Sequence, residues 1–273
     1  MRLEDYPPQE PLSEAGQRYG EECWRRGEGV AAEEHAYGED PYQRLLVMPA
    51  PRPTGDVLLF WHGGGWTSGY KEWMAFMAPA LPAAGVTFVT AGYRLAPRHV
   101  FPAGFEDCAA ALAWVHANCA RFGGDTSRIF VGGHSAGGHY AALLATRRDW
   151  QARHGLPADV IRAALPISGV YQFGEGSGLS ARPRFLGPEG NDADASPMSW
   201  LDAPPRPMLL AWGSQDFPHL IGQAERFAAA ARAAGGAIRT LVLPDRSHFT
   251  ASYAGGEADG PWVPEALAFL GTA

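Results

Sequence analysis

Short runs of hydrophobic residues recur along most of this 273-residue chain and alternate with segments in which apolar positions are spaced differently. The runs are rich in Val, Ile, Leu, Phe and Trp, and residues that favour turns commonly follow them. This pattern is typical of short buried β-strands. We expect strands at residues 43–48, 56–61, 86–90, 128–131, 163–167, 208–212 and 238–243.

The segments between these runs carry apolar residues every three or four positions, as on one face of an amphipathic helix. Residues 104–120 show this spacing from Phe105 to Cys119, and a pair of glycines follows at 123–124 as a helix stop. His116 lies on the same apolar face, where a core histidine is the expected role. We expect further helices at residues 136–145, 219–234 and 261–270.

Strands that alternate with helices predict an α/β protein with a mostly parallel central sheet and helices on both faces. We expect residues 1–273 to form one domain with two additions. Residues 1–40 form an N-terminal arm, in which Ala15, Tyr19 and Cys23 share one face of a helix behind Ser13. Residues 171–204 are irregular and far longer than an ordinary connection, so we expect a short cap over the catalytic end of the sheet.

Composition excludes several classes of protein. No apolar stretch is long enough to span a bilayer, and the N-terminus lacks the pattern of a secretory signal. The three cysteines contain no CxxC pair, and two of them are about 16 Å apart on one expected helix, so reduced thiols in a cytoplasmic protein are expected. The single lysine and many alanines hint at a GC-rich bacterial genome.

The net charge of −7 arises within residues 1–40, which hold eleven acidic residues against four arginines. The remainder of the chain is balanced, and we expect the acidic stretch to be a solvated helix face. An acidic chain without a basic stripe is a poor partner for nucleic acid. A small molecule is therefore the expected partner, with no membrane or nucleic acid, and a homodimer stays open.

Ser135 stands in a Gly-x-Ser-x-Gly pattern, Gly133-His134-Ser135-Ala136-Gly137. The pattern follows an expected strand and opens an expected helix. That placement is typical of a nucleophile elbow, in which small neighbours allow a strained turn that exposes the serine hydroxyl. Ser135 is therefore the expected nucleophile.

A second glycine-rich segment, His62-Gly63-Gly64-Gly65-Trp66, follows the expected strand at residues 56–61. Consecutive glycines allow backbone N–H groups to face an open site, where they can stabilise the oxyanion of an acyl-transfer intermediate. We expect an oxyanion hole made by the N–H groups of Gly64, Gly65 and Ala136. His62 is expected to support this loop through its side chain.

A serine nucleophile needs a base that is oriented by an acid, and on this scaffold the chain order is serine, acid, histidine. Asp216 and His248 both follow late strands, where parallel sheets place their sites. His248 is the expected base and Asp216 the expected acid. Asp245 is the rival acid, although its position three residues before His248 favours a role in its own loop.

Aromatic residues and one further histidine lie close in sequence to these positions and favour an apolar acyl or aryl pocket. No cofactor is expected, and no metal site, because His134 and His139 are spaced wrongly for one helical metal-binding face. The expected substrate-binding residues are Trp66, Trp73, His139, Tyr171, Phe217 and Phe249.

From about residue 41 onward the chain resembles α/β-hydrolases of the esterase and lipase group that carries the HGGG motif. Beyond the two motifs above, Tyr93-Arg94-Leu95-Ala96-Pro97 and Gly124-Asp125-Thr126-Ser127-Arg128-Ile129 match stretches typical of that group. The hormone-sensitive-lipase-like branch usually has Asp before the nucleophile, whereas kynurenine formamidase-like relatives share the His found here. The resemblance implies Ser135, Asp216 and His248 as a triad.

These observations predict a cofactor-independent serine carboxylesterase that cleaves small to medium apolar or aryl esters through an acyl-enzyme. An arylformamidase that uses the same triad is the alternative. A ligand-binding protein on a hydrolase scaffold is a distant third hypothesis, because such proteins typically lack a triad member. A peptidase is disfavoured because no region resembles the extra domain that usually screens peptide size.

Overall fold

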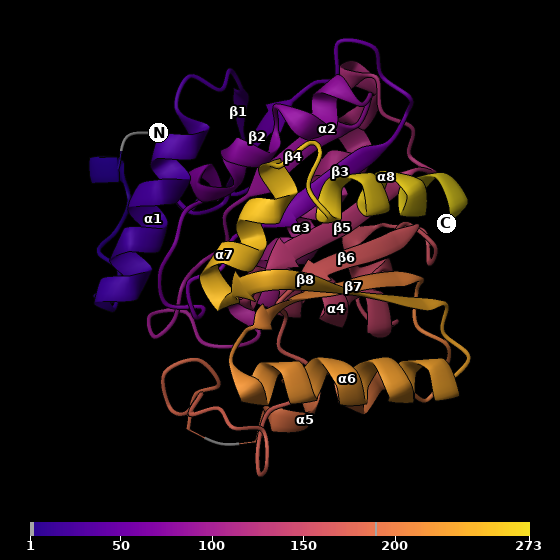
Figure 1. Cartoon of the computed structure of the whole chain (residues 1–273). Coiled ribbons are helices and arrows are strands. Elements are labelled where there is room, and N and C mark those ends of the chain that lie inside the picture. Colours follow the sequence, from indigo (N-terminus) through magenta and orange to yellow (C-terminus); the bar gives the residue numbers. More distant parts are fainter. Residues whose placement is uncertain (1–2, 189) are drawn as a thin grey trace.

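The computed structural model describes residues 3–188 and 190–273, and its centre is an eight-stranded sheet (Figure 1). The strand order is β1-β2-β4-β3-β5-β6-β7-β8. Strand β2 pairs antiparallel with β1 and β4, and every other neighbouring pair is parallel. The strands are β1 (Glu33–Ala36), β2 (Arg44–Met48), β3 (Val57–Trp61), β4 (Thr87–Ala91), β5 (Ile129–His134), β6 (Ala163–Ile167), β7 (Met208–Gln215) and β8 (Ile238–Ser247).

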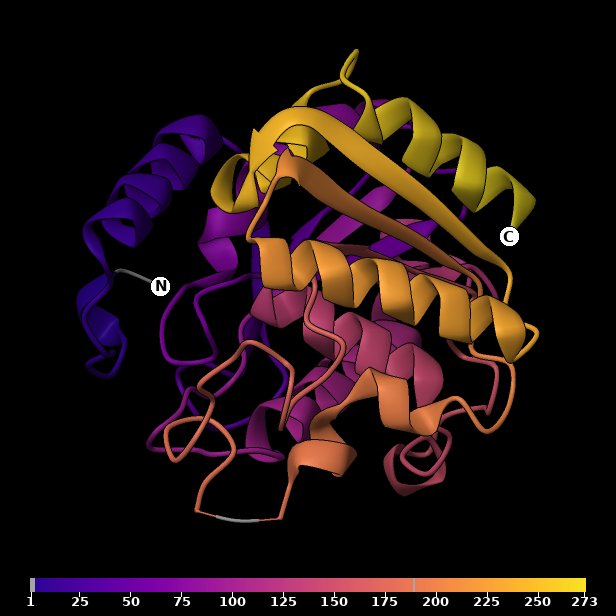
Figure 2. The same ribbon diagram turned by 60° about the horizontal axis from the view of Figure 1, so that its bottom comes forward.

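Helices cover both faces of the sheet, as Figures 1 and 2 show. The α-helices are α1 (Glu14–Gly27), α2 (Ala80–Ala83), α3 (Ala103–Asn118), α4 (Ala136–Thr146), α5 (Asp192–Ala195), α6 (Pro218–Ala233), α7 (His248–Tyr253) and α8 (Trp262–Thr272). Short 3₁₀ helices are η1 (Leu3–Asp5), η2 (Lys71–Met77), η3 (Cys119–Phe122), η4 (Ala152–His154), η5 (Pro197–Trp200) and η6 (Ala254–Gly256).

Strand β3 shows why the sheet needs cover on both sides, because all five of its residues are buried. Successive side chains of a strand point to opposite faces. Leu59 and Trp61 pack into one hydrophobic cluster with α3, α4 and α6, whereas Leu58 and Phe60 pack into another with α1, η2 and α8. Such continuous apolar strands are expected of a parallel sheet buried on both faces.

The fold class expected from the sequence is confirmed, and the differences lie at element boundaries and in polar elements. Strands β7 and β8 extend three or more residues beyond the expected ends, to Gln215 and Ser247. Strand β1 was not expected because its sequence, Glu-Glu-His-Ala, has no hydrophobic alternation. It pairs on one side only, at the edge of the sheet, where polar side chains remain exposed.

The N-terminal arm packs onto the body of the molecule through α1, which lies beside α7 in Figure 1. The Ser13 side chain accepts a hydrogen bond from the Gly16 N–H and caps this helix. Tyr19 and Cys23 are buried on the packed face of α1. The expected shared face of this helix is therefore present in the structure.

Residues 171–188 and 190–204 form loops with α5 and η5, drawn in orange in Figure 2. Gln223 of α6 anchors their start, since its buried side chain accepts from the N–H groups of Tyr171 and Gln172 and donates to the Ser177 carbonyl. The Ser196 hydroxyl accepts from the Phe173 N–H near the end of the segment. Two buried side-chain anchors thus hold an otherwise irregular segment.

Within the described ranges, no helix combines the length and hydrophobicity needed to cross a bilayer. The three cysteines, Cys23, Cys108 and Cys119, are buried free thiols.

Candidate active site

Ser135 occupies a strained turn between β5 and α4. Its backbone lies at φ 54° and ψ −113°, outside the regions that L-residues ordinarily adopt. Two glycines permit this turn: a Cβ on Gly133 would lie 2.2 Å from the Gly137 carbonyl carbon, and one on Gly137 would lie 2.1 Å from the Trp61 oxygen. The Ser135 N–H donates to the Ile167 oxygen at 2.9 Å. The turn therefore presents the hydroxyl at the carboxyl end of β5.

Ser135, His248 and Asp216 lie in one hydrogen-bonded row. The Ser135 Oγ is 2.9 Å from His248 Nε2, and His248 Nδ1 is 2.8 Å from Asp216 Oδ1. These residues follow β5, β8 and β7, whose carboxyl ends meet at the same edge of the sheet. Asp245 is exposed near the end of β8, and its N–H donates to the Ser214 hydroxyl. The row contains the expected acid and not its rival.

The Asp216 carboxylate is buried but well supplied with donors. Burial raises the pKa of this group, yet the hydrogen bond and charge of His248, the Ser168 hydroxyl and the Phe217 N–H together hold the pKa below its ordinary value. Asp216 therefore stays ionised, as the partner of an imidazole that gains a proton must be. Ser168 has a φ of 51°, so a second strained residue lies next to the row.

The glycine loop after β3 leaves backbone donors beside Ser135. A Cβ on Gly64 would lie 1.9 Å from the Ser68 oxygen, so only glycine fits there, whereas Gly65 faces open space. Among the described residues, the N–H groups of Gly64, Gly65 and Ala136 donate to no protein acceptor. Ala136 is the first residue of α4, where N–H groups lack helical partners and favour negative charge.

A cavity of about 470 Å³ opens next to Ser135 and His248. Its walls include four of the expected substrate-binding residues, Trp66, Trp73, Phe217 and Phe249. The ring of Phe217 is half exposed and stacks on His248 with 4.8 Å between the ring centroids. The cavity lining is mainly apolar, which suits an uncharged organic group.

His139 and Tyr171 do not line this cavity, which corrects the expectation for both residues. His139 is fully buried, where it accepts from the Trp66 indole N–H and contacts the Ala195 oxygen at 2.7 Å. Tyr171 is also fully buried and stacks on Phe227 of α6, with ring centroids 4.5 Å apart. Both side chains hold the segment that begins at Tyr171 against the core and lie outside the cavity.

Three groups of pocket residues were not expected from the sequence. The cavity continues along the N-terminal arm, the segment after β6 and the start of α6, and an ion pair between Glu10 and Arg184 joins the first two. The helical periodicity of α1 marked its buried face but did not show which part of the core that face covers. The missed lining residues include Pro11, Leu12, Gly16, Tyr19, Val170, Leu179, Arg184, His219 and Leu220.

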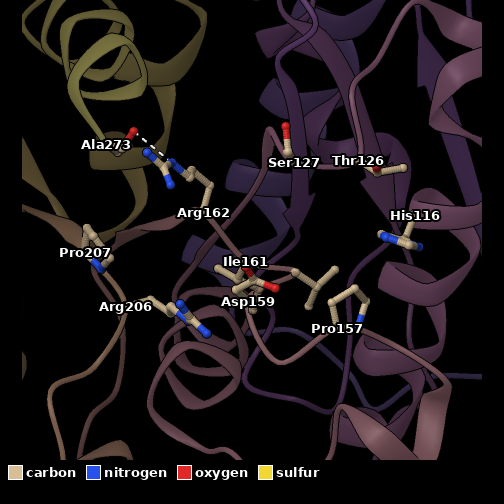
Figure 3. Close-up of a pocket in the computed structure, with 11 residues that line it drawn as sticks. His116, Thr126, Ser127, Pro157, Asp159, Ile161, Arg162, Arg206, Pro207 and Ala273 are labelled. Atoms are coloured by element: carbon tan, nitrogen blue, oxygen red, sulfur yellow. Dashed lines mark hydrogen bonds between the residues drawn. The ribbon is translucent and has the colours of Figure 1, made fainter.

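A larger cavity, of about 520 Å³, lies at the opposite end of the sheet (Figure 3). Ser127, Arg162 and Pro207 in its lining precede β5, β6 and β7, so it borders the amino ends of these strands. Figure 3 shows the Arg162 side chain hydrogen-bonded to the Ala273 oxygen. This cavity has no contact with Ser135 or His248, so the smaller cavity is the candidate site.

Within residues 3–188 and 190–273, no group of three or more His, Cys, Asp or Glu side chains has the arrangement of a metal site. His134 and His139 bind other parts of the chain: His134 Nε2 contacts the His248 oxygen and His139 Nε2 the Ala195 oxygen.

Three buried imidazoles predict a loss of stability in mild acid. Burial lowers the pKa of His62 to about 4 and that of His139 to about 4; burial and the nearby His248 charge lower that of His134 to about 3. The unfolded chain binds these protons near pH 6.5, so stability is present above that pH and is lost below it. We expect each imidazole to cost about 2 kcal/mol of unfolding free energy at pH 5.

Thermal unfolding measured at pH 8, 7, 6 and 5 checks this expectation. The midpoint should be level between pH 8 and 7 and fall steeply below pH 6. A His139→Gln variant should show a shallower fall, because it has one such imidazole fewer. An equal midpoint at pH 8 and pH 5 would contradict the account.

Comparison with known families and sequences finds an α/β-hydrolase family model and several esterases. A family model described as alpha/beta hydrolase fold matches residues 58–184. Esterase LipC of Mycobacterium tuberculosis is 33% identical over 235 residues, which cover 78% of this chain and 58% of that protein. Carboxylesterase NlhH of the same species is 45% identical over 103 residues, covering 37% of this chain and 32% of that protein. The chain spans from about a third to just over half of these relatives' length.

Solved structures show the same architecture. EstE1, a thermophilic carboxylesterase cloned from a metagenomic library, superposes with a TM-score of 0.73 at 22% identity and covers 95% of both chains. The apo form of Thermogutta terrifontis esterase 2 gives a TM-score of 0.72 at 25% identity, with 88% of this chain and 92% of that chain covered.

Proposed function

The chain has the α/β-hydrolase fold and is related in sequence to bacterial esterases, and we propose that it is a serine hydrolase of carboxylic esters. The observation that carries this proposal is the row from Ser135 Oγ through His248 to Asp216, with separations of 2.9 and 2.8 Å. A serine without a catalytic role would not require a strained backbone, or a histidine that is hydrogen-bonded to a buried carboxylate.

In the first half of the reaction, Ser135 Oγ bonds to the ester carbonyl carbon while its proton passes to His248 Nε2. The carbonyl oxygen becomes an oxyanion that the N–H groups of Gly64, Gly65 and Ala136 stabilise. The bond to the alcohol oxygen then breaks, and the leaving group takes the proton from His248. The products are a free alcohol and an acyl ester on Ser135.

In the second half, water attacks the acyl carbonyl and gives a proton to His248, again through an oxyanion. Collapse of this intermediate breaks the bond to Ser135 Oγ, which recovers its proton from the imidazole and releases the carboxylic acid. Asp216 accepts the Nδ1–H of His248 throughout, so Nε2 faces the serine and the imidazolium that forms is stabilised.

The cavity supports a small to medium apolar or aryl substrate. Its volume of about 470 Å³ lies in the range of small-molecule sites. Trp66, Phe217 and Phe249 supply aromatic surface on it. Phe217 stacks on the base that must protonate the leaving group, so an aryl alcohol would meet this ring as it departs.

Turnover of p-nitrophenyl acetate and of N-formylkynurenine, measured side by side, tests the proposal. We expect kcat/KM for the ester to exceed that for the formamide by a factor of about 100 or more, because the cavity accepts groups much larger than formyl. A preference for the formamide would replace the esterase proposal with an arylformamidase. Turnover of neither compound would favour a ligand-binding role.

A further inference from the structure

Tyr19 of α1 is the first residue of a second hydrogen-bonded row, which runs through His134 to the main chain of His248. The Tyr19 hydroxyl is 3.2 Å from His134 Nδ1 and 3.0 Å from the Ser252 hydroxyl. His134 Nε2 is 2.8 Å from the main-chain oxygen of His248. This row thus joins residues that lie more than 100 positions apart in sequence. It ends on the main chain of His248, the expected base.

The positions of the protons in this row follow from its acceptors. A main-chain oxygen can only accept, so His134 Nε2 carries a hydrogen and donates it to His248. Burial lowers the pKa of His134 to about 3, so the ring is neutral and its Nδ1 has a free lone pair. In the contact between Tyr19 and His134, the hydroxyl is therefore the donor and Nδ1 the acceptor. Tyr19 has only this one hydrogen, so its contact with Ser252 is a hydrogen bond only when the Ser252 hydroxyl donates to Tyr19 and not to the Phe249 oxygen.

The row is buried and is held by packing on several sides. His134 is about 1% exposed and Tyr19 about 4%, so these hydrogen bonds are shielded from bulk water although both residues border the cavity. The Tyr19 ring packs edge-on against Trp73 and stacks on Tyr253, with centroids 5.5 and 5.7 Å apart. Leaving a buried polar group without a partner costs free energy of folding. The Tyr19 hydroxyl is therefore held in its hydrogen bonds.

We propose that Tyr19 is a positioning residue, which orients His134 and through it holds the backbone of His248 at the start of α7. Its hydroxyl does not touch the reacting atoms. A displacement of the base by about 1 Å costs roughly a hundredfold in rate, so a looser anchor has a measurable effect. The N-terminal arm is thereby part of the catalytic apparatus as well as a wall of the cavity.

This inference rests on the proposed function, because it takes His248 as the base. The test compares the full chain with Tyr19→Phe, which keeps the ring and removes the donor. Tyr253→Phe is the matched control, since its ring stacks on Tyr19 and its hydroxyl takes no part in the row. Two quantities are measured: kcat and KM for p-nitrophenyl acetate, and the rate of Ser135 labelling by a fluorophosphonate probe.

We expect Tyr19→Phe to lower kcat and the labelling rate about tenfold with KM changed less than about twofold, and Tyr253→Phe to match the wild type. In a His134→Leu background, Tyr19→Phe should have no further effect, because the polar side chain through which it acts is gone. Wild-type labelling by Tyr19→Phe would overturn the inference, and so would an undiminished tenfold effect in the His134→Leu background.

If Tyr19→Phe fails to fold, the His134→Leu variant alone tests the inference: a tenfold loss of labelling supports the row, and unchanged labelling overturns it. The labelling rate also separates the two proposals. Absence of ester turnover in the wild type would reject the esterase proposal. The Ser135 labelling rates of the wild type and the variants would still test the role of Tyr19.

Discussion

The Ser135→Ala variant is expected to lose ester hydrolysis by a factor of about 10⁴ to 10⁶ in kcat, because no other group can form the acyl-enzyme. The proton acceptor and the oxyanion donors would remain, so only weak water attack could continue. The folded structure should be unaffected, since alanine lacks only a half-buried hydroxyl and leaves the flanking glycines in place.

Steady-state kinetics of purified wild type and variant measure the loss, and thermal unfolding serves as the control. The unfolding free energy should change by less than about 1 kcal/mol, as for a change that opens no large cavity. Residual hydrolysis above about 1% of the wild-type rate, in a preparation free of contaminating esterase, would remove Ser135 from its assigned role.

The Asp216→Asn variant is expected to lose a factor of about 10⁴ in kcat at neutral pH, although its shape is almost unchanged. An amide can donate to Nδ1, which favours the tautomer with hydrogen on Nε2. The lone pair needed at Nε2 to accept the Ser135 proton is then missing. The negative charge that stabilises the imidazolium is lost as well.

Asp245→Asn is the matched control, because Asp245 is the other carboxylate close to His248 in sequence. Its side chain is exposed, and asparagine tolerates its φ of 56°. This variant should retain wild-type kcat. Full activity in Asp216→Asn together with loss in Asp245→Asn would transfer the role of acid to Asp245.

The sheet and the row of Ser135, His248 and Asp216 could be predicted because both depend on local patterns. Buried parallel strands produce continuous apolar runs, and the ends of consecutive parallel strands meet at one edge. Chain order then predicts Asp216 as the acid and His248 as the base. Strand β1 lacks such a pattern, since an edge strand gains its order from pairing and needs no buried side chains.

The walls of the cavity could be predicted only in part. Proximity in sequence to Ser135 suggested that His139 faces the substrate, but one helical turn along α4 directs it to the cap instead. Tyr171 begins an irregular segment whose path no periodicity describes, and its ring packs on α6. The packing of α1 against the site depends on tertiary contacts between residues more than 100 positions apart in sequence, such as Tyr19 and His134. Local patterns do not reveal such contacts.

Labelling of the wild-type chain with a fluorophosphonate probe, followed by peptide mass spectrometry, tests the central claim most directly. The probe reacts with an activated serine whatever the natural substrate is. We predict one adduct, on the peptide that contains Ser135, and none in the Ser135→Ala variant. An unlabelled wild type, or an adduct on another residue, would contradict the account.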